Sequence, residues 1–243
     1  MATEAQRPGP AAPVRRPQGR RGGRLKIFFG FAPGVGKTFR MLQVARGLLG
    51  QGQDVVVGAV ETHGRPDAAS LLLGLEVLPR RALPSRGRVL EEFDLDAALT
   101  RRPRLLLLDE MAHANAPGSR HARRWQDAME LLDAGIDVHT TLDVQDLEGL
   151  AEVVEQITQV QVRETVPESV LERADEIELV DIAPEELLQR VRDGQVYLPE
   201  PAARMVDHYF QRGNLLALRQ LALRRLAERV DADVRSSREA PPD

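Results

Sequence analysis

The sequence predicts an α/β protein in which a mostly parallel sheet is flanked by helices and followed by a helical C-terminal extension. Two features predict this class. The first is a set of short apolar runs with almost no polar face, which are typical of buried parallel strands. The second is the alternation of these runs with amphipathic stretches, which are typical of helices. Strands joined by helices give a parallel sheet with right-handed crossovers. Ligands bind such sheets at the carboxyl ends of the strands, so a site is expected in the loops that follow them.

The elements follow in order along the chain. The predicted strands are residues 25–29, 54–60, 104–109, 136–141, 160–162 and 176–180. The predicted helices are residues 38–49, 66–73, 92–99, 121–133, 144–156, 168–173, 185–192, 201–211 and 215–230. Residues 78–88, rich in proline and arginine, are predicted to be a loop, and Asp143 is expected to cap the helix that follows it. Together these elements predict four regions: a disordered basic arm (1–24), a nucleotide-binding α/β domain (25–182), a helical extension packed on it (183–232) and a disordered tail (233–243).

The first strand runs into a glycine-rich loop, LKIFFGFAPGVGKT, that resembles a phosphate-binding loop of the P-loop NTPase (Walker A) kind. Glycines let the backbone turn tightly and bring its N–H groups close to an anion. Lys37 would reach the β- and γ-phosphates, the Thr38 hydroxyl would hold Mg²⁺, and the following helix would direct its positive N-terminus at the same phosphates. The predicted nucleotide-binding residues are Gly30, Pro33, Gly34, Val35, Gly36, Lys37, Thr38 and Phe39.

One position departs from the strict motif. A glycine is expected five residues before Gly36, where the chain has Phe31, and the nearest glycine is Gly30, one place early. The alternative interpretation is a glycine-rich loop without chemistry. The order of strand, loop, Gly-Lys-Thr and amphipathic helix favours the phosphate loop.

A nucleotide site also needs an acidic residue at the end of a buried strand. Asp109 follows the run RLLLL and is the candidate for binding Mg²⁺, directly or through water. Glu110 is the candidate for positioning or deprotonating an attacking water. The alternative is that the two acids only begin a polar loop.

Polar side chains near this edge could sense the γ-phosphate, as switch loops do. The long loop after Glu110 is dense in hydrogen-bond donors, and a second polar group follows the strand at 54–60. The candidates are Glu61, His63, Arg65, His113, Asn115, Ser119 and Arg120. Surface polarity explains Glu61, His63 and Arg65 equally well. A metal site beyond Mg²⁺ is not expected, because His113 and His121 lack ligand spacing on one helix.

Composition narrows the class of protein. The chain has 243 residues, a net charge of −4, no cysteine and no apolar run long enough to span a bilayer. No leader of the secretory kind is visible, so a cytoplasmic protein is expected. The net charge does not favour a nucleic-acid partner. The arginine-rich arm could be an inert tail or a salt-dependent contact with an acidic partner.

Seven segments carry a resemblance: LKIFFGFAPGVGKT, VVVGAVETHGR, LLLDEMAHANAPGSRHARRWQD, GIDVHTTLDVQ, VRETVPESVLERADEIELVDIAPEELLQR, VYLPE and FQRGNLLALRQLALRR. They resemble the cytoplasmic N-terminal domain of the KdpD family, sensor histidine kinases of potassium-responsive two-component systems. The resemblance covers residues 25–230. The family's loop also carries its first glycine one place early, so the position of Gly30 fits it.

The resemblance implies ATP binding at Gly34, Gly36, Lys37 and Thr38, with Asp109 in the second motif. It also implies a regulatory domain whose nucleotide tunes the kinase and phosphatase activities of a distant C-terminal half. This chain shows no kinase core, so it is expected to be a free-standing or truncated form, and kinase activity and membrane insertion are not carried over. Its expected partner is a histidine kinase or its own homo-oligomer.

The sequence therefore predicts an ATP- and Mg²⁺-binding regulatory module of a two-component signalling system. A slow NTPase is the main alternative, with Glu110 as base and Arg65 or Arg120 stabilising the transferred charge. A phosphotransferase acting on a small acceptor is a third reading. A scaffold that has lost its nucleotide chemistry is a fourth, which Lys37, Thr38 and Asp109 argue against.

Overall fold

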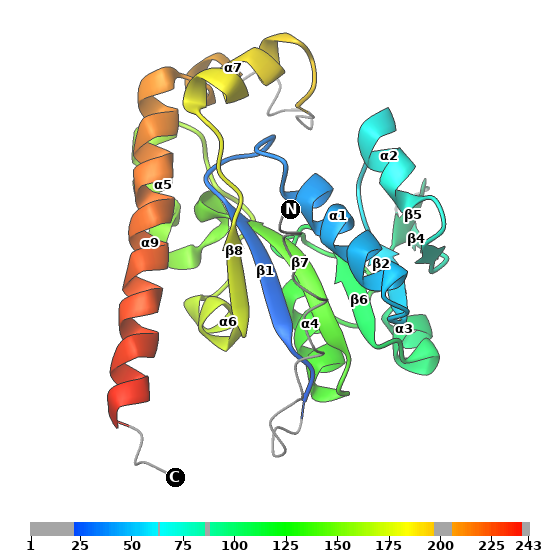
Figure 1. Ribbon diagram of the computed structural model, residues 1–243. Helices are drawn as coiled ribbons and strands as arrows, with labels where there is room; N and C mark the ends of the chain where they lie inside the picture. Colours follow the sequence, from blue (N-terminus) through cyan, green and yellow to red (C-terminus); the bar gives the residue numbers. More distant parts are fainter. Residues whose placement is uncertain (1–21, 63, 86–87, 197–205, 240–243) are drawn as a thin grey trace, which may run out of the picture.

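The computed structural model describes residues 22–62, 64–85, 88–196 and 206–239 (Figure 1). The main strands are β1 (Leu25–Gly30), β2 (Val55–Ala59), β3 (Glu76–Val77), β6 (Leu105–Leu108), β7 (Asp137–Asp143) and β8 (Glu176–Leu179). They form one sheet in the order β3-β2-β6-β7-β1-β8, and every neighbouring pair is parallel. The predicted α/β class is confirmed.

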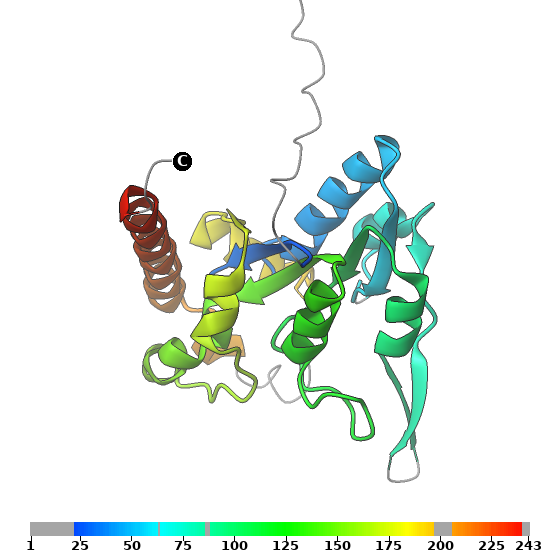
Figure 2. The same cartoon turned by 90° about the horizontal axis from the view of Figure 1, so that it is seen from below.

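Helices connect the strands. They are α1 (Lys37–Gly50), α2 (Pro66–Leu72), α3 (Leu95–Arg101), α4 (Arg124–Asp133), α5 (Ala151–Thr158), α6 (Glu168–Arg173), α7 (Pro184–Arg192), α8 (Val206–Tyr209) and α9 (Arg212–Glu239), with two 3-10 turns, η1 (Val144–Asp146) and η2 (Glu148–Leu150). Figure 2 shows the sheet edge-on, with the blue helix α1 on one side and the green helix α4 on the other.

Alternate residues of each strand enter two separate cores, because successive side chains of a strand point to opposite faces. Phe28, Val57 and Leu107 pack with Met41 and other residues of α1 and α2. The neighbouring positions on the same strands pack against α3, α4, α6 and α9. Both faces are apolar, which explains why the strands read as continuous hydrophobic runs.

Three predicted elements differ in the structure. Residues 81–92, predicted as mostly loop, form an antiparallel hairpin of β4 (Arg81–Ser85) and β5 (Arg88–Glu92). The hairpin buries Leu83 but leaves Val89 exposed, so it lacks the apolar signal of the central strands. Residues 160–162 form no strand; the Val162 N–H instead donates to Glu155 Oε1 at 2.8 Å. The predicted helix 144–156 is broken into η1, η2 and α5.

The two ends of the chain also differ from the predicted regions. α9 continues to Glu239, so residues 233–239, predicted as a disordered tail, are helical. Of the predicted helix 201–211, only α8 and the residues after it lie among the described residues. Most of the predicted basic arm, residues 1–21, lies outside them. Arg24 already belongs to the domain, because its carbonyl accepts a hydrogen bond from Val138 N–H at 2.8 Å.

The fold brings four strand ends together at one edge of the sheet. β1 ends at Gly30, β2 at Ala59, β6 at Leu108 and β7 at Asp143. β7 lies between β1 and β6, so the glycine loop and Asp109 are separated by one strand. Helix α7 lies at this same end of the sheet (Figure 1).

Candidate functional site

The glycine loop connects β1 to α1 and has an unusual backbone. Gly34 and Gly36 have φ values of +88° and +106°, in the region that side chains other than glycine rarely occupy. Lys37 and Thr38 form the first turn of α1. Two glycines with positive φ, separated by Val35 and followed directly by a helix N-terminus, give a concave backbone of the kind that binds anions.

Gly30 has a different role. A Cβ at this position would lie 2.8 Å from Val35 Cγ2 and 2.9 Å from Lys37 Cδ, so any side chain would push the loop away from the strand. Phe31, where the strict motif has glycine, is fully buried in the core. The early glycine therefore fits a loop that folds back over the end of β1.

The other predicted loop residues lie in or beside the same turn. Pro33 and Phe39 are half-buried and Val35 is buried. Among the described residues, no side-chain hydrogen bond caps the start of α1, and no acidic residue lies in its first turn. The positive N-terminus of α1 therefore has no carboxylate of its own first turn opposing an anion.

Lys37 is held by an acid that the sequence assigned only to helix capping. Lys37 Nζ lies 2.6 Å from Asp143 Oδ1, at the end of β7, and 3.4 Å from the carbonyl of Ala32. Both side chains of the ion pair are about nine-tenths buried, with exposures of 10% and 11%. Burial raises the pKa of Asp143, while the charge of Lys37 opposes that rise. Asp143 thus belongs to the candidate site. Its position directly after the strand run HTTL was the sequence feature that could have predicted this.

Thr38 and Asp109 meet across the site. Thr38 Oγ1 donates to the Asp109 carboxylate, 3.0 Å from Oδ2 and 3.2 Å from Oδ1, and Thr141 Oγ1 donates to Oδ1 at 2.6 Å. The Glu61 N–H adds a longer contact of 3.4 Å to Oδ2. Burial, reinforced by the charge of Glu110, raises the pKa of Asp109. A hydroxyl and a carboxylate from two distant segments are therefore placed together, as the predicted Mg²⁺ ligands require.

Glu110 follows directly in a strained backbone position. Its φ is +56°, and its N–H donates to Thr141 Oγ1 at 3.0 Å. Its charge adds to the effect of burial in raising the pKa values of Asp109 and Asp143. Non-glycine residues in this region are uncommon and concentrate at functional sites.

The side chains of the predicted switch loop make their contacts away from the phosphate loop. His113 Nε2 lies 3.0 Å from Glu92 Oε2, and Asn115 Nδ2 donates to Asp127 Oδ2 at 2.6 Å. Arg120 pairs with Asp96 and Glu130. Ser119 Oγ is buried and has no hydrogen-bond partner among the described residues. These contacts tie the loop to β5, α3 and α4, and a sensor role for the four residues stays a prediction.

A buried arginine connects this network to the site. Arg124 is 1% exposed; its guanidinium donates to Glu92 Oε1 at 2.8 Å and to the Asp109 carbonyl at 3.0 Å. Burial opposes ionisation of Glu92, but the bonds from His113 and the Phe93 N–H and the charge of Arg124 together lower its pKa. Neither Arg124 nor Glu92 was predicted as part of the site. An arginine at the start of a helix is usually exposed to solvent, so the sequence did not indicate that Arg124 is buried.

The candidates that follow β2, Glu61, His63 and Arg65, lie only partly at the carboxyl edge of the sheet. The Glu61 backbone contacts Asp109, but its side chain accepts a hydrogen bond from Arg80 at 2.8 Å. Arg65 precedes α2, and its N–H donates to the Thr62 carbonyl. His63 lies outside the described residues.

Two further contacts reach the site from the C-terminal helices. Arg190 Nη1 donates to the carbonyls of Gly34 and Val35 at 3.1 and 3.3 Å. Tyr209 donates to Gln145, in the 3-10 turn that follows Asp143. Neither contact could be predicted, since the partners are far apart in sequence.

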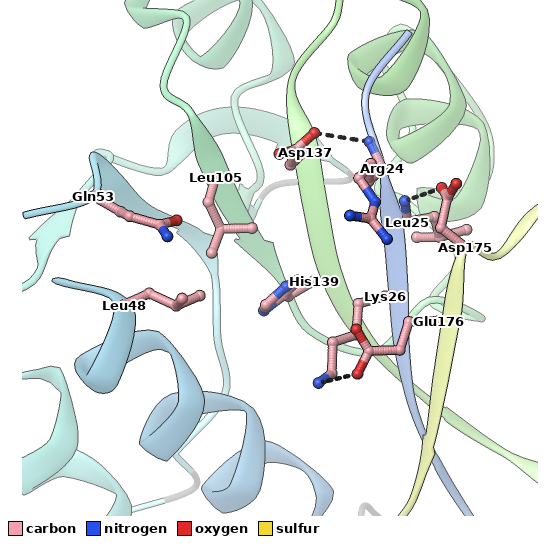
Figure 3. Close-up of a pocket in the computed structure, with 10 residues that line it drawn as sticks. All are labelled: Arg24, Leu25, Lys26, Leu48, Gln53, Leu105, Asp137, His139, Asp175 and Glu176. Carbon is pink, nitrogen blue, oxygen red and sulfur yellow. Dashed lines mark hydrogen bonds and ion pairs between the residues drawn. The ribbon is translucent and has the colours of Figure 1, made fainter. Parts of the chain in front are cut away.

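A small cavity of about 120 Å³ lies away from the candidate site, at the opposite edge of the sheet (Figure 3). It is lined by residues at the beginnings of β1, β7 and β8, including Lys26, His139 and Glu176, and by none of the predicted site residues. Figure 3 shows the His139 ring between Leu48 and Lys26. Strand beginnings and strand ends lie at opposite edges of a parallel sheet, so this cavity is separate from the glycine loop.

Residues 22–62, 64–85, 88–196 and 206–239 contain neither a metal-binding cluster nor a membrane-spanning helix. In that part of the chain, no three His, Asp or Glu side chains are grouped so as to hold a metal ion. Within the same ranges, no helix has both the length and the apolar character needed to cross a membrane.

The fold and the edge geometry define an α/β protein whose parallel sheet carries a glycine loop, a lysine and buried acids at its carboxyl end. A family model described as KdpD, osmosensitive K⁺ channel His kinase sensor domain, matches residues 21–230. The chain belongs to this KdpD sensor-domain family.

Similar proteins of known name belong to the same family. The chain is 54% identical over 241 residues to the sensor protein KdpD of Escherichia coli, covering 99% of this chain and 27% of that protein. It is 47% identical over 216 residues to the sensor protein KdpD of Clostridium acetobutylicum, covering 89% of this chain and 24% of that protein. A putative sensor protein KdpD of Synechocystis is 44% identical over 223 residues, with 92% and 60% covered. The chain thus spans about a quarter of the length of the first two relatives.

Proposed function

We propose that the carboxyl edge of the sheet binds ATP with Mg²⁺, and that the chain is the nucleotide-responsive regulatory module of a potassium-responsive two-component sensor. The observation that carries the proposal is the Thr38–Asp109 contact. It places a hydroxyl of the glycine loop 3.0 Å from a buried carboxylate that is 71 positions away in sequence. Lys37, next to Thr38, lies at the same edge.

The residues present fit this ligand. The left-handed glycines and the N-terminus of α1 would hold the phosphates, with Lys37 Nζ turned from Asp143 toward the β- and γ-phosphates. Thr38 and Asp109 would hold Mg²⁺, which supplies charge neutralisation between the phosphate oxygens when bound. Both are hard oxygen donors, as that ion prefers.

The regulatory part of the proposal comes from the relatives. They are named as sensor proteins, and this chain matches about a quarter of the length of two of them. We assign to the chain a cytoplasmic role in which nucleotide occupancy modulates a histidine kinase. That kinase is either part of the same assembly or reached through a second copy of this chain.

Calorimetric titration of the full chain with ATP in the presence of Mg²⁺ tests the binding proposal. We expect K37A to abolish measurable binding and T38A to remove its dependence on Mg²⁺. K26A is the matched control, because Lys26 is the only other lysine and pairs with Glu176 and Glu178. Absence of ATP binding in the wild type, or equal affinity in K37A and K26A, would contradict the proposal.

One observation favours slow NTP hydrolysis as a second candidate. Glu110 is the residue after Asp109, has a positive φ of +56°, and donates its N–H to Thr141 Oγ1, the hydroxyl that also bonds Asp109. A carboxylate in this position could orient or deprotonate a water. Phosphate release by E110Q, compared with wild type and with the exposed control E152Q, decides between turnover and binding alone. Equal rates near zero in all three proteins leave a binding module without turnover.

A further inference from the structure

We infer that Arg190 of α7 is a positioning residue that holds the glycine loop with its backbone N–H groups directed toward a phosphate. This inference rests on the proposed nucleotide site and adds the element that orders it. Arg190 is 156 positions from Gly34 in the chain, yet its guanidinium bonds directly to the loop backbone.

The contact is specific in its geometry. Nη1 of Arg190 donates to the Gly34 carbonyl at 3.1 Å and to the Val35 carbonyl at 3.3 Å. Nη2 of the same guanidinium donates to Glu186 at 2.7 Å, one helical turn earlier on α7. Because Nη2 is bonded to Glu186, the planar guanidinium is oriented with Nη1 toward the loop carbonyls. The Arg190 side chain is 31% exposed, so most of it is packed against the protein while part of it faces solvent.

The orientation of the peptide groups follows from this contact. In a planar trans peptide, the carbonyl and the N–H of the next residue point in opposite directions. With the Gly34 and Val35 carbonyls turned to Arg190, the N–H groups of Val35 and Gly36 point to the opposite side of the loop. Glycine peptides rotate easily, so the loop would not keep this orientation by sequence alone. Arg190 restrains the rotation that the glycines permit.

Helix α7 and the segment that follows it pack closely on the loop. A Cβ at Gly34 would lie 2.5 Å from Cγ2 of Val196, which follows α7, and 3.1 Å from Cδ1 of Leu187, which belongs to α7. Leu187 is fully buried, and Arg212 of α9 pairs with Glu185 at the start of α7. Glycine is therefore needed at position 34 for two reasons, its positive φ and the close approach of Val196 and α7.

This arrangement couples the site to the C-terminal helices. If Arg190 orders the loop for phosphate, then phosphate on the loop must stabilise the docked position of α7 by the same free energy, because coupling between two binding events is reciprocal. α7 contacts α9, so nucleotide occupancy has a direct route to the end of the described chain.

The test compares R190M with R192M in the full chain. Methionine keeps the apolar stem and removes the donors. Arg192 is a matched control because its guanidinium donates to Gln189 on its own helix and, among the described residues, not to the loop. Affinities for Mg²⁺ complexes of ATP, ADP and inorganic pyrophosphate are measured by calorimetry. We expect R190M to weaken all three by the same factor of about ten, as for the loss of one or two charge-assisted hydrogen bonds. We expect R192M to match the wild type and R190K to recover part of the loss.

Hydrogen exchange without nucleotide gives a second readout that does not depend on ATP. R190M should speed exchange at the amides of residues 34–38, with a melting temperature within a few degrees of the wild type. If exchange is unchanged, or if R190M weakens ATP but not pyrophosphate, the inference is overturned. If the wild type binds none of the three probes, the proposed function fails, and the exchange data alone decide whether Arg190 orders the loop.

Discussion

Lys37 Nζ and Asp143 Oδ1 lie 2.6 Å apart at the centre of the carboxyl edge of the sheet. The charge of the loop lysine is thus balanced by the carboxylate at the end of β7, while its ammonium group also lies 3.4 Å from the loop carbonyl of Ala32. A phosphate that uses Lys37 must compete with this carboxylate. The ion pair therefore sets part of the affinity for an anion.

Replacing Asp143 with asparagine should strengthen nucleotide binding. The substitution removes a competing negative charge about one ion-pair distance from Lys37, and we expect about tenfold tighter ATP binding in a partly buried site. Calorimetry against D181N is the comparison, because Asp181 pairs with Arg219 instead of Lys37. Weaker binding in D143N would show that Asp143 supports the ligand rather than competing with it.

Loss of Arg124 should destabilise the domain strongly. R124M leaves the buried Glu92 carboxylate without its guanidinium partner and removes the donor to the Asp109 carbonyl, which predicts a loss of about 3–5 kcal/mol in the free energy of unfolding. Urea denaturation measures this loss. The double variant R124M/E92Q should regain part of it, since the isolated charge is gone. Additive losses in the double variant would mean that the pair is not coupled.

Thr141 supports two groups at once, so its hydroxyl should matter more than that of an exposed threonine. It donates to Asp109 Oδ1 at 2.6 Å and accepts from the Glu110 N–H at 3.0 Å. T141V leaves both groups without this partner, and we expect a loss of about 1–3 kcal/mol in unfolding free energy. T100V serves as the control, because Thr100 is exposed on α3 and should change stability by no more than about 0.5 kcal/mol. Equal effects of the two variants would contradict this assignment.

His139 should make the protein sensitive to acid. Burial, together with the charge of Lys26, lowers the pKa of His139 to about 4, below its ordinary value of 6.5. The neutral ring is therefore favoured in the folded state, and the stability it contributes is complete above pH 6.5 and is lost as the pH falls through 4. Thermal unfolding from pH 7 to pH 4 should show a shallower decline in H139Q than in wild type. H208Q, at an exposed histidine on α8, should decline as the wild type does.

The sequence predicted the elements whose signal is local. The runs IFF, VVV and LLLL are apolar on both faces, and they form the buried strands. The loop motif and the Asp-Glu pair were found because strand ends carry ligands in this class of fold. The hairpin β4–β5 was missed because its strands carry charged residues and a proline in place of an apolar run.

The missed site residues share a different cause. Asp143 reads in sequence as a helix cap, Arg190 as an exposed helix residue and Arg124 as a surface charge. Each acquires its role from a partner more than ten positions away, and for Arg190 and Asp143 more than 100. Local periodicity carries no information on such contacts. They become visible only when the strand order is known.

Thr141 and Asp143 are separated by one residue on β7, so their side chains leave the strand on the same face. One contacts the acid that follows β6, and the other contacts the lysine that follows β1. The distance between the acidic half and the lysine half of the edge is thus fixed by the rise of two strand residues, about 6.6 Å. Insertions or deletions in the surrounding loops would leave this spacing intact, whereas a bulge in β7 would change both halves together.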